Sequence, residues 1–376
     1  MTELAAHFPW WQIREPENID SPALIVYPER VKENIGLLVA MSGGDAGRLR
    51  PHVKTNKSKE AVLLMMEAGI TKFKCATIAE AEMLGVCGAP DVLLAYQPVG
   101  PKICRLLALV EAFPATVFSC LIDNLPAARE LSGVFTGAGR VLPVFIDLNV
   151  GMNRTGIAPG QAALQLYRDS MRLPGVKPAG LHAYDGHIRD KDFALRRQQC
   201  EAAFVQVWAL RDAIRKESGS DPLVVAGGSP TYPIHAENKG VESSPGTFIY
   251  WDKGYQDQLP EQAFLPAALV IARVISLPDE RKLCLDLGHK SVSAENELTK
   301  RVFFLNAPEL QPLGQSEEHL VVEAGAGHSF KIGDLLYGLP FHVCPTVALH
   351  ERALTVENGL FTGEWRTVSR DKKITI

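Results

Sequence analysis

The sequence predicts an α/β protein in which a (β/α)8 barrel of the TIM type is followed by a mainly antiparallel β domain. From about residue 21 to residue 250, short apolar runs bounded by turn residues alternate with longer segments of helical periodicity. This alternation is typical of a parallel sheet wrapped by helices. After about residue 258 the segments become short, β-rich and separated by turns. A chain of 376 residues is long enough for a barrel of roughly 250 residues and one further domain.

Eight apolar runs in the first part are candidate barrel strands: 23–27, 48–55, 72–77, 91–96, 116–122, 141–149, 178–184 and 222–228. Segments between them, such as SKEAVLLMMEAG, carry apolar residues at three- and four-residue spacing, as outer helices do. An open doubly wound sheet is the competing architecture. It would normally show a Gly-rich phosphate turn after the first strand, and ALIVYPERVKENI has none. We therefore expect a barrel over 21–258 and a β domain over 259–376, with residues 1–20 packing on the second.

Composition and charge exclude several classes of protein. The formal net charge is −4, and the basic residues form no cluster of the kind that binds nucleic acid. No apolar run reaches the roughly 18 residues of a membrane span, and the first residues do not resemble a signal peptide. The seven cysteines are scattered without a CxxC pair, so neither a disulfide framework nor a zinc ribbon is indicated. We expect a cytoplasmic protein that acts on a small molecule.

The segment RPHVKTNK concentrates basic residues in a predicted strand. Alternate side chains share one face of a strand, so Arg50, His52 and Lys54 should point the same way. If that face is the barrel interior, burial would lower the pKa of Lys54, as suits an amine that forms a Schiff base. The alternative is an edge strand whose basic residues are simply solvated.

RPHVKTNK resembles the N-terminal signature of D-threonine aldolases and D-serine dehydratases, which belong to the alanine-racemase-like (fold type III) family of pyridoxal-phosphate enzymes. The resemblance runs from SPALIVY at 21 through HVCPTVAL at 342 and includes several motifs in order. It implies that Lys54 binds pyridoxal phosphate. It also implies a homodimer in which the second domain of one chain closes over the barrel mouth of the other.

Two further motifs extend the resemblance to other cofactor contacts. In FIDLNVGMNRTG, Arg154 matches the family's arginine near the phenolic oxygen of the cofactor and the substrate carboxylate. In PAGLHAYDGHIRD, Tyr184 corresponds to the aromatic residue that packs against the pyridine ring. His187 lies in the loop beyond that strand, where barrel enzymes gather their catalytic groups, and is our candidate general base. Thr77, in KCATIAEAE, is a further candidate cofactor contact.

Two glycine-containing turns are candidates for holding the phosphate, because backbone amides and hydroxyls can converge on a dianion. In their order after Lys54 they match the family's phosphate loops, which assigns Gly228, Ser229, Gly246 and Thr247 to the cofactor. Alanine racemases place an arginine just before the Pro-Gly of the second loop, whereas this chain has Ser244 there. This departure argues against plain racemase chemistry.

A pair of metal-binding side chains occurs in PFHVCPTV. His342 and Cys344 are two residues apart on a predicted strand and so on one face, where an imidazole and a thiolate can chelate a borderline-soft cation. The pair also matches the family's metal site, which implies a divalent metal, zinc or manganese.

Taken together, the resemblance implies a pyridoxal-phosphate and metal-dependent lyase acting on a D-β-hydroxy-α-amino acid. We favour a D-threonine aldolase-like activity that yields glycine and an aldehyde. A D-serine dehydratase, which releases ammonia and a keto acid, is the alternative, and a non-catalytic pyridoxal-phosphate carrier is the contrasting class.

Overall fold

The computed structural model describes residues 9–376, which form two compact units. The barrel unit comprises residues 35–248, 258–263 and 368–376, and the β unit comprises the described residues before 35 together with 249–257 and 264–367. These limits differ from the predicted division at both ends of the chain. The C-terminal segment joins the barrel unit because Glu82 accepts hydrogen bonds from the amides of Thr375 and Ile376.

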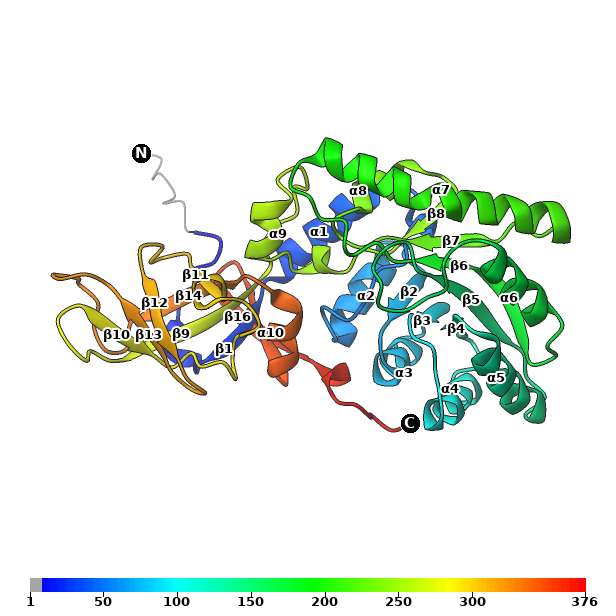
Figure 1. Cartoon of the computed structure of the whole chain (residues 1–376). Helices are drawn as coiled ribbons and strands as arrows, with labels where there is room; N and C mark the ends of the chain where they lie inside the picture. The colour runs from blue at the N-terminus through cyan, green and yellow to red at the C-terminus, as the bar shows by residue number, and fades with distance from the viewer. Residues whose placement is uncertain (1–8) are drawn as a thin grey trace, which may run out of the picture. The chain divides into compact units, whose positions relative to one another are not determined.

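The barrel unit is built on a seven-stranded parallel sheet in the order β2 to β8 (Figure 1). Its strands are β2 (Lys72–Cys75), β3 (Asp91–Leu94), β4 (Val117–Ile122), β5 (Leu142–Leu148), β6 (Val176–Ala183), β7 (Leu223–Ala226) and β8 (Val241–Ser243). Residues 49–52 lie between β8 and β2, because Leu49 forms a parallel bridge to Ser243 and His52 forms one to Lys74. This segment supplies the eighth position and closes the sheet, so the predicted TIM-like barrel is confirmed.

Helices alternate with the barrel strands along the chain and cover the outside of the sheet, the first of them preceding the segment 49–52 (Figure 1). They are α1 (Pro28–Met41), α2 (Lys59–Glu67), α3 (Ile78–Val86), α4 (Pro101–Ala112), α5 (Leu125–Gly137), α6 (Gln161–Met171), α7 (Phe193–Ser218) and α8 (Tyr232–Glu237). Several begin at side chains that cap free amides. Asn124 accepts from the amide of Ala127 at the start of α5, and Asp192 accepts from Ala194 and Leu195 at the start of α7.

The barrel interior has an apolar cluster and a layer of paired charges. Leu93, Leu121, Phe145 and Val225, from four different strands, pack together. Elsewhere in the interior, buried Arg50 pairs with Asp91 and Glu242, and Glu242 also pairs with Lys72. Removing one member of such a network typically costs about 3–5 kcal/mol, because the remaining charges stay buried without a partner.

The β unit contains a nine-stranded, mainly antiparallel sheet, as predicted for the second domain. The main strand order is β12-β13-β10-β9-β1-β15-β16, with β14 paired to β9 and β11. Its strands are β1 (Ala23–Val26), β9 (Ala268–Ser276), β10 (Lys282–Leu285), β11 (Val302–Phe304), β12 (Gln311–Gln315), β13 (Leu320–Glu323), β14 (Leu335–Pro340), β15 (Arg352–Glu357) and β16 (Leu360–Arg366). Two short helices, α9 (Lys253–Gln258) and α10 (Val343–Leu349), complete it.

The structure corrects the assignment of two strands. The run 23–27, predicted as the first barrel strand, is β1 of the β unit, where it pairs with β9 and β15. The barrel strand Val241–Ser243 was not predicted, since three residues are too few for a periodic signal. A buried apolar run such as Leu24 to Val26 reveals that a strand is covered on both sides, but not which sheet it joins.

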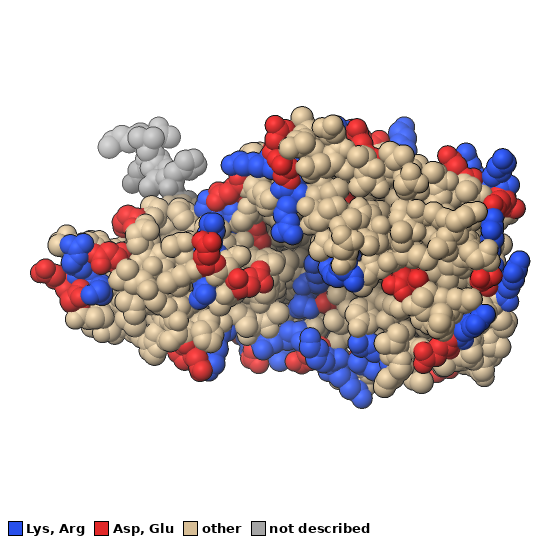
Figure 2. Space-filling model, in the orientation of Figure 1, with Lys and Arg blue, Asp and Glu red and all other residues tan. Residues whose placement is uncertain are grey.

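Acidic and basic side chains are interspersed over most of the face drawn in Figure 2. Among the described residues, no helix combines the length and apolarity that crossing a bilayer requires.

Candidate functional site

The motif that carries Lys54 forms a turn at one end of the closing segment of the barrel. Residues 53–56 are a turn, and the Lys54 side chain is exposed. The amide of Lys54 donates to His52 Nδ1 over 3.2 Å, which fixes the start of this turn. The expectation that Lys54 is a buried strand residue is therefore wrong, because the strand-like segment ends before it. An exposed amine at this position is free to reach a ligand.

The two predicted phosphate turns lie side by side. Ser229 Oγ accepts hydrogen bonds from the amides of Gly246, at 3.4 Å, and Thr247, at 3.2 Å, and all three residues are buried. A Cβ added to Gly246 would lie 3.0 Å from the carbonyl oxygen of His52, so the loop and the Lys54 turn are close together and a larger residue would push them apart by a few tenths of an ångström. Amides that already converge on one oxygen suit an oxyanion such as phosphate.

Tyr184 follows β6 and adjoins the first of these turns. Its ring lies 3.1 Å from the position of a Cβ added to Gly228. Arg154 Cζ lies 5.0 Å from the centre of the same ring. A Cβ added to Gly151 would lie 2.6 Å from His187 Nε2, so His187 packs against the loop that carries Arg154. The structure thus places Tyr184, Arg154 and His187 in one neighbourhood after β5 and β6.

Four titratable side chains that the sequence analysis did not assign to the site lie beneath these loops. Asp147 Oδ1 lies 2.8 Å from His182 Nδ1. Burial lowers the pKa of His182 despite this carboxylate, and burial with the nearby charges of Lys54 and Lys74 lowers the pKa of His52 well below its usual value. Burial and the charge of Lys54 also lower the pKa of Lys74 to about 7. The buried lysine of this barrel is therefore Lys74.

A buried cluster connects the end of β6 to the phosphate turn. Asp185 Oδ2 lies 2.8 Å from His235 Nε2, Asp185 Oδ1 accepts from Thr231 Oγ1 at 2.8 Å, and Cys200 Sγ lies 3.6 Å from Asp185 Oδ2. Asp185, Cys200 and His235 could hold a metal ion by their type and proximity. However, burial and the charge of Asp185 raise the pKa of Cys200, which disfavours a thiolate ligand. The hydrogen bonds of Asp185 to Thr231 and His235 instead hold the first phosphate turn in position.

Thr77, the remaining predicted cofactor contact, lies at the start of α3. Its hydroxyl accepts from the amide of Glu80 at 3.1 Å, so it caps the helix. The hydroxyl can still donate a hydrogen bond to another group. Its contact with a cofactor stays a prediction.

The predicted metal ligands form a second group, within the β unit. His342 precedes α10 and Cys344 lies in its first turn, so the expected strand is wrong. The helix forms because buried Asp252 accepts from the amide of Val343, and Pro345 occupies a first-turn position where no amide donor is needed. Burial raises the pKa of Asp252 to about 6, although amide hydrogen bonds oppose the rise.

His342 nevertheless contacts both an acidic side chain and the predicted cysteine. Its ring hydrogen-bonds to Glu295 and to Cys344, which outweigh burial and raise the pKa of His342 to about 9. Nitrogen, sulfur and carboxylate donors thus meet at one place in the β unit. This set suits a divalent metal of intermediate softness. Asp252 and Glu295 were not predicted, because single acidic residues in YWDKG and SAENEL carry no motif.

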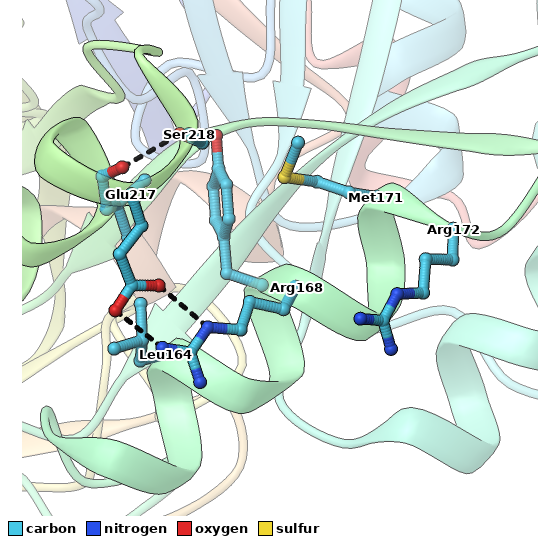
Figure 3. Close-up of a pocket in the computed structure, with 8 residues that line it drawn as sticks. Leu164, Arg168, Met171, Arg172, Glu217 and Ser218 are labelled. Atoms are coloured by element: carbon cyan, nitrogen blue, oxygen red, sulfur yellow. Dashed lines mark hydrogen bonds and ion pairs between the residues drawn. The ribbon is translucent and has the colours of Figure 1, made fainter.

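A separate cavity of about 390 Å³ lies between α6 and α7 (Figure 3). It is lined by Leu164, Tyr167, Arg168, Met171, Arg172, Ile214, Glu217 and Ser218. Arg168 and Glu217 form an ion pair across it, with Nε and Oε2 2.7 Å apart. These residues come from outer helices rather than from the ends of the barrel strands, so the cavity contributes nothing to the candidate site.

Comparison with known families matches both parts of the chain. Residues 26–253 match the model of the alanine racemase N-terminal domain. Residues 267–356 match that of a putative serine dehydratase domain.

Individual relatives are similar over nearly the whole chain. A D-threonine aldolase of Arthrobacter sp. is 27% identical over 360 residues, covering 94% of this chain and 93% of that protein. A 3-hydroxy-D-aspartate aldolase of Paracoccus denitrificans (strain Pd 1222) is 26% identical, covering 95% and 94%. A D-threo-3-hydroxyaspartate dehydratase of Delftia sp. (strain HT23) is 25% identical, covering 92% and 97%.

Solved structures share the fold. The crystal structure of D-threonine aldolase from Filomicrobium marinum has a TM-score of 0.86 at 25% identity, covering 94% of this chain and 96% of that one. An alanine racemase of Clostridium difficile 630, in complex with cycloserine, has a TM-score of 0.71 at 12% identity, covering 93% and 99%. The latter likeness concerns the fold alone.

Proposed function

This chain belongs to the alanine-racemase-like, fold type III family of pyridoxal-phosphate proteins, with a D-threonine aldolase/D-serine dehydratase-like domain, and we propose from this premise that it is a metal-dependent D-threonine aldolase. The coarser class is a lyase of the group that includes aldolases and dehydratases of D-β-hydroxy amino acids. The contact of His342 with Cys344 and Glu295 in the β unit, beside buried Asp252, supports the metal dependence. The observation that carries the aldolase proposal is the packing of His187, a candidate base, against the loop that carries Arg154.

The barrel residues fit pyridoxal phosphate. The amides of Gly246 and Thr247, gathered by Ser229, suit its phosphate, and the half-buried ring of Tyr184 suits its pyridine face. When bound, the cofactor withdraws electrons from the α-carbon of an amino acid. Lys54 would hold the cofactor covalently, Arg154 would bind an anionic group as a planar fork, and Gly228 would let the Tyr184 ring approach the phosphate turn.

The metal would be held by His342 and Cys344, with zinc or manganese as candidates. A bound cation favours loss of the proton from a hydroxyl group that it contacts. His187, beside the Arg154 loop, is the proposed base that takes the β-hydroxyl proton in the aldolase reaction. Loss of that proton allows the Cα–Cβ bond to break, which gives glycine and an aldehyde.

Dehydration of a D-β-hydroxy amino acid, such as D-serine, is the second candidate function. Solved structures of D-threo-3-hydroxyaspartate dehydratase include a histidine-to-alanine variant and, two positions further along, a cysteine-to-alanine variant in a metal-free form. That spacing equals the spacing of His342 and Cys344. In this reaction Lys54 would remove the α-proton, and the metal would help hydroxide to leave.

A non-catalytic pyridoxal-phosphate carrier is the contrasting class. A carrier needs the barrel but has no need of a metal site. The donor set of the β unit, together with the serine dehydratase domain over residues 267–356, therefore favours a lyase.

The deciding experiment incubates the protein, loaded with pyridoxal phosphate and zinc or manganese, with D-threonine and identifies the products. Glycine and acetaldehyde support the aldolase. The keto acid 2-oxobutyrate and ammonia support the dehydratase. A spectral change without any product would support the carrier. D-Serine and 3-hydroxy-D-aspartate, tested in parallel, determine the substrate.

A further inference from the structure

Lys74 is a buried ammonium group without an ionic partner. Its side chain is only 2% exposed, and no hydrogen bond or ion pair reaches its Nζ from the described part of the chain. Three nearby cations are paired, by contrast, since Arg50 and Lys72 contact Glu242 and Lys57 contacts Glu80. An unpaired buried charge is costly, so a residue that keeps one usually has a role that needs it.

Lys74 points into the barrel. Lys72, two residues earlier on β2 and therefore on the same face, reaches Glu242 of β8 across the segment 49–52. Lys74 Nζ lies 5.8 Å from the centre of the Tyr184 ring, and Arg154 Cζ lies 5.0 Å from the same ring. Two cations therefore lie within 6 Å of the aromatic side chain that is proposed to hold the pyridine ring.

The charged groups around Lys74 do not neutralise it. Lys54 and Arg50 repel its charge, while Asp185 and Asp147 attract it. Both carboxylates already have partners, Asp147 in His182 and Asp185 in His235 and Thr231. His52, bridged to Lys74 through the backbone, has a lowered pKa and adds no anion. The charge of Lys74 is therefore not balanced by the side chains around it, and one further anionic group beside it would balance that charge.

The order of the barrel strands indicates which anion this is. The phosphate residues follow β7 and β8, Lys54 follows the segment 49–52, and Lys74 is on β2, on the other side of that segment. In pyridoxal phosphate the aldehyde carbon is on C4, the phosphate arm on C5 and the phenol oxygen on C3. With C4 at Lys54 and C5 toward β7 and β8, the phenol oxygen faces the β2 side.

We propose that Lys74 is a cofactor-binding residue that donates a hydrogen bond to the phenol oxygen of pyridoxal phosphate. This inference rests on the proposed positions of Lys54 and the phosphate turns. Lys74 complements Arg154, which approaches the Tyr184 ring from the loop after β5. An anionic oxygen supplies the ion partner that Lys74 otherwise lacks, and the contact holds the ring in register with Lys54.

The test compares two cofactors by absorbance titration of cofactor-free protein. Pyridoxal phosphate and 3-deoxypyridoxal phosphate differ only in the phenol oxygen. Lys74→Met, which keeps the length of the side chain, should weaken binding of pyridoxal phosphate about tenfold and change binding of the 3-deoxy analogue less than twofold. Lys72→Met, on the same face of β2 but paired with Glu242, is the matched control and should affect neither affinity selectively.

Equal loss for the two cofactors in Lys74→Met, or no loss for either, would overturn the inference. Failure of the wild-type protein to bind pyridoxal phosphate would instead contradict the proposed function. The two failures are therefore distinguishable.

Discussion

Asp185 and His235 form a buried pair, with Oδ2 and Nε2 2.8 Å apart, that connects the end of β6 to α8. Asp185 directly follows Tyr184, and its second oxygen accepts from Thr231, two residues after Ser229. One carboxylate thus connects the proposed ring-stacking residue with the proposed phosphate turn. It acts as a positioning residue, since it lies beneath the loops rather than among the groups assigned to the cofactor.

Replacing Asp185 with Asn should therefore weaken binding of the phosphate more than binding of the ring. The amide has the shape of the carboxylate but accepts through only one oxygen, so it cannot hold both Thr231 and His235 as the carboxylate does. We expect about tenfold weaker binding of pyridoxal phosphate and little change for pyridoxal, which lacks the phosphate. Absorbance titration measures both affinities.

Cys200→Ala is the control for this prediction. Its thiol lies 3.6 Å from Asp185 and 3.5 Å from His235, at the limit of sulfur hydrogen bonding, and removing it leaves the Asp185–His235 pair intact. The variant should bind both cofactors as the wild type does. A loss shared equally by pyridoxal and pyridoxal phosphate in Asp185→Asn would contradict a role at the phosphate turn.

Local pattern predicted the barrel, because its strands and helices alternate in sequence and each strand from β2 to β7 falls on a predicted run. The local pattern does not show which strands pair when they are far apart in the sequence. The run that became β1 looks like any other buried strand, and only its partners β9 and β15 place it in the β unit. The HVCPTVAL segment looks β-prone, yet the capping contact from Asp252 to Val343 makes it helical.

For the candidate site, the sequence motifs indicated which residues take part but not their burial or their hydrogen-bond partners. Lys54 and Lys74 both lie in short basic segments, and only the turn at 53–56 distinguishes the exposed lysine from the buried one. The Asp185–His235 pair could not be predicted from the sequence, because the two residues are 50 positions apart. The proximity of Ser229 to Gly246 and Thr247 could be expected only from the resemblance.

Replacing Lys54 with Ala should abolish the visible absorbance band of the bound cofactor while leaving the protein folded. The side chain is exposed in a turn, so its removal opens no cavity in the core. Circular dichroism checks folding, and absorbance after dialysis and borohydride reduction checks the covalent link. Lys57→Ala, three residues away, serves as a comparison that should keep the band. A Lys54→Ala protein that still retained the reduced cofactor would contradict the assignment.

Removal of the metal should abolish lyase activity without releasing pyridoxal phosphate, since the two groups of ligands belong to different units. His342→Ala and Cys344→Ala should each lower the bound metal, measured by atomic emission, because each removes one of two proposed ligands. Cys284→Ala, a half-buried cysteine on β10, is the control and should keep its metal. Full activity in excess chelator would remove the metal from the mechanism.

The resemblance also predicts a homodimer, in which the second domain of one chain closes over the barrel mouth of the other. Covering the mouth excludes water from the reacting groups. Light scattering under assay conditions should give twice the mass of the 41.1 kDa chain. A fully active monomer would contradict this arrangement.

The last prediction concerns the stability cost of Lys74. Burial and the charge of Lys54 lower its pKa from 10.5 to about 7 in the folded protein, whereas the unfolded chain keeps the ordinary value. Between pH 7 and about 10 the unfolded state therefore binds more protons, so this group makes the folded state more stable as the pH rises through that window. At pH 7 and below it destabilises the cofactor-free protein by a few kcal/mol, because its charge is buried.

Lys74→Met should accordingly raise the melting temperature of cofactor-free protein at pH 7, and the gain should shrink toward pH 10. Lys72→Met should instead lower the melting temperature, since it takes one partner from Glu242. Thermal denaturation at several pH values measures both. A lower melting temperature of Lys74→Met at pH 7 would show that the ammonium has a partner inside the folded protein, and a gain independent of pH would show that the gain does not come from its titration.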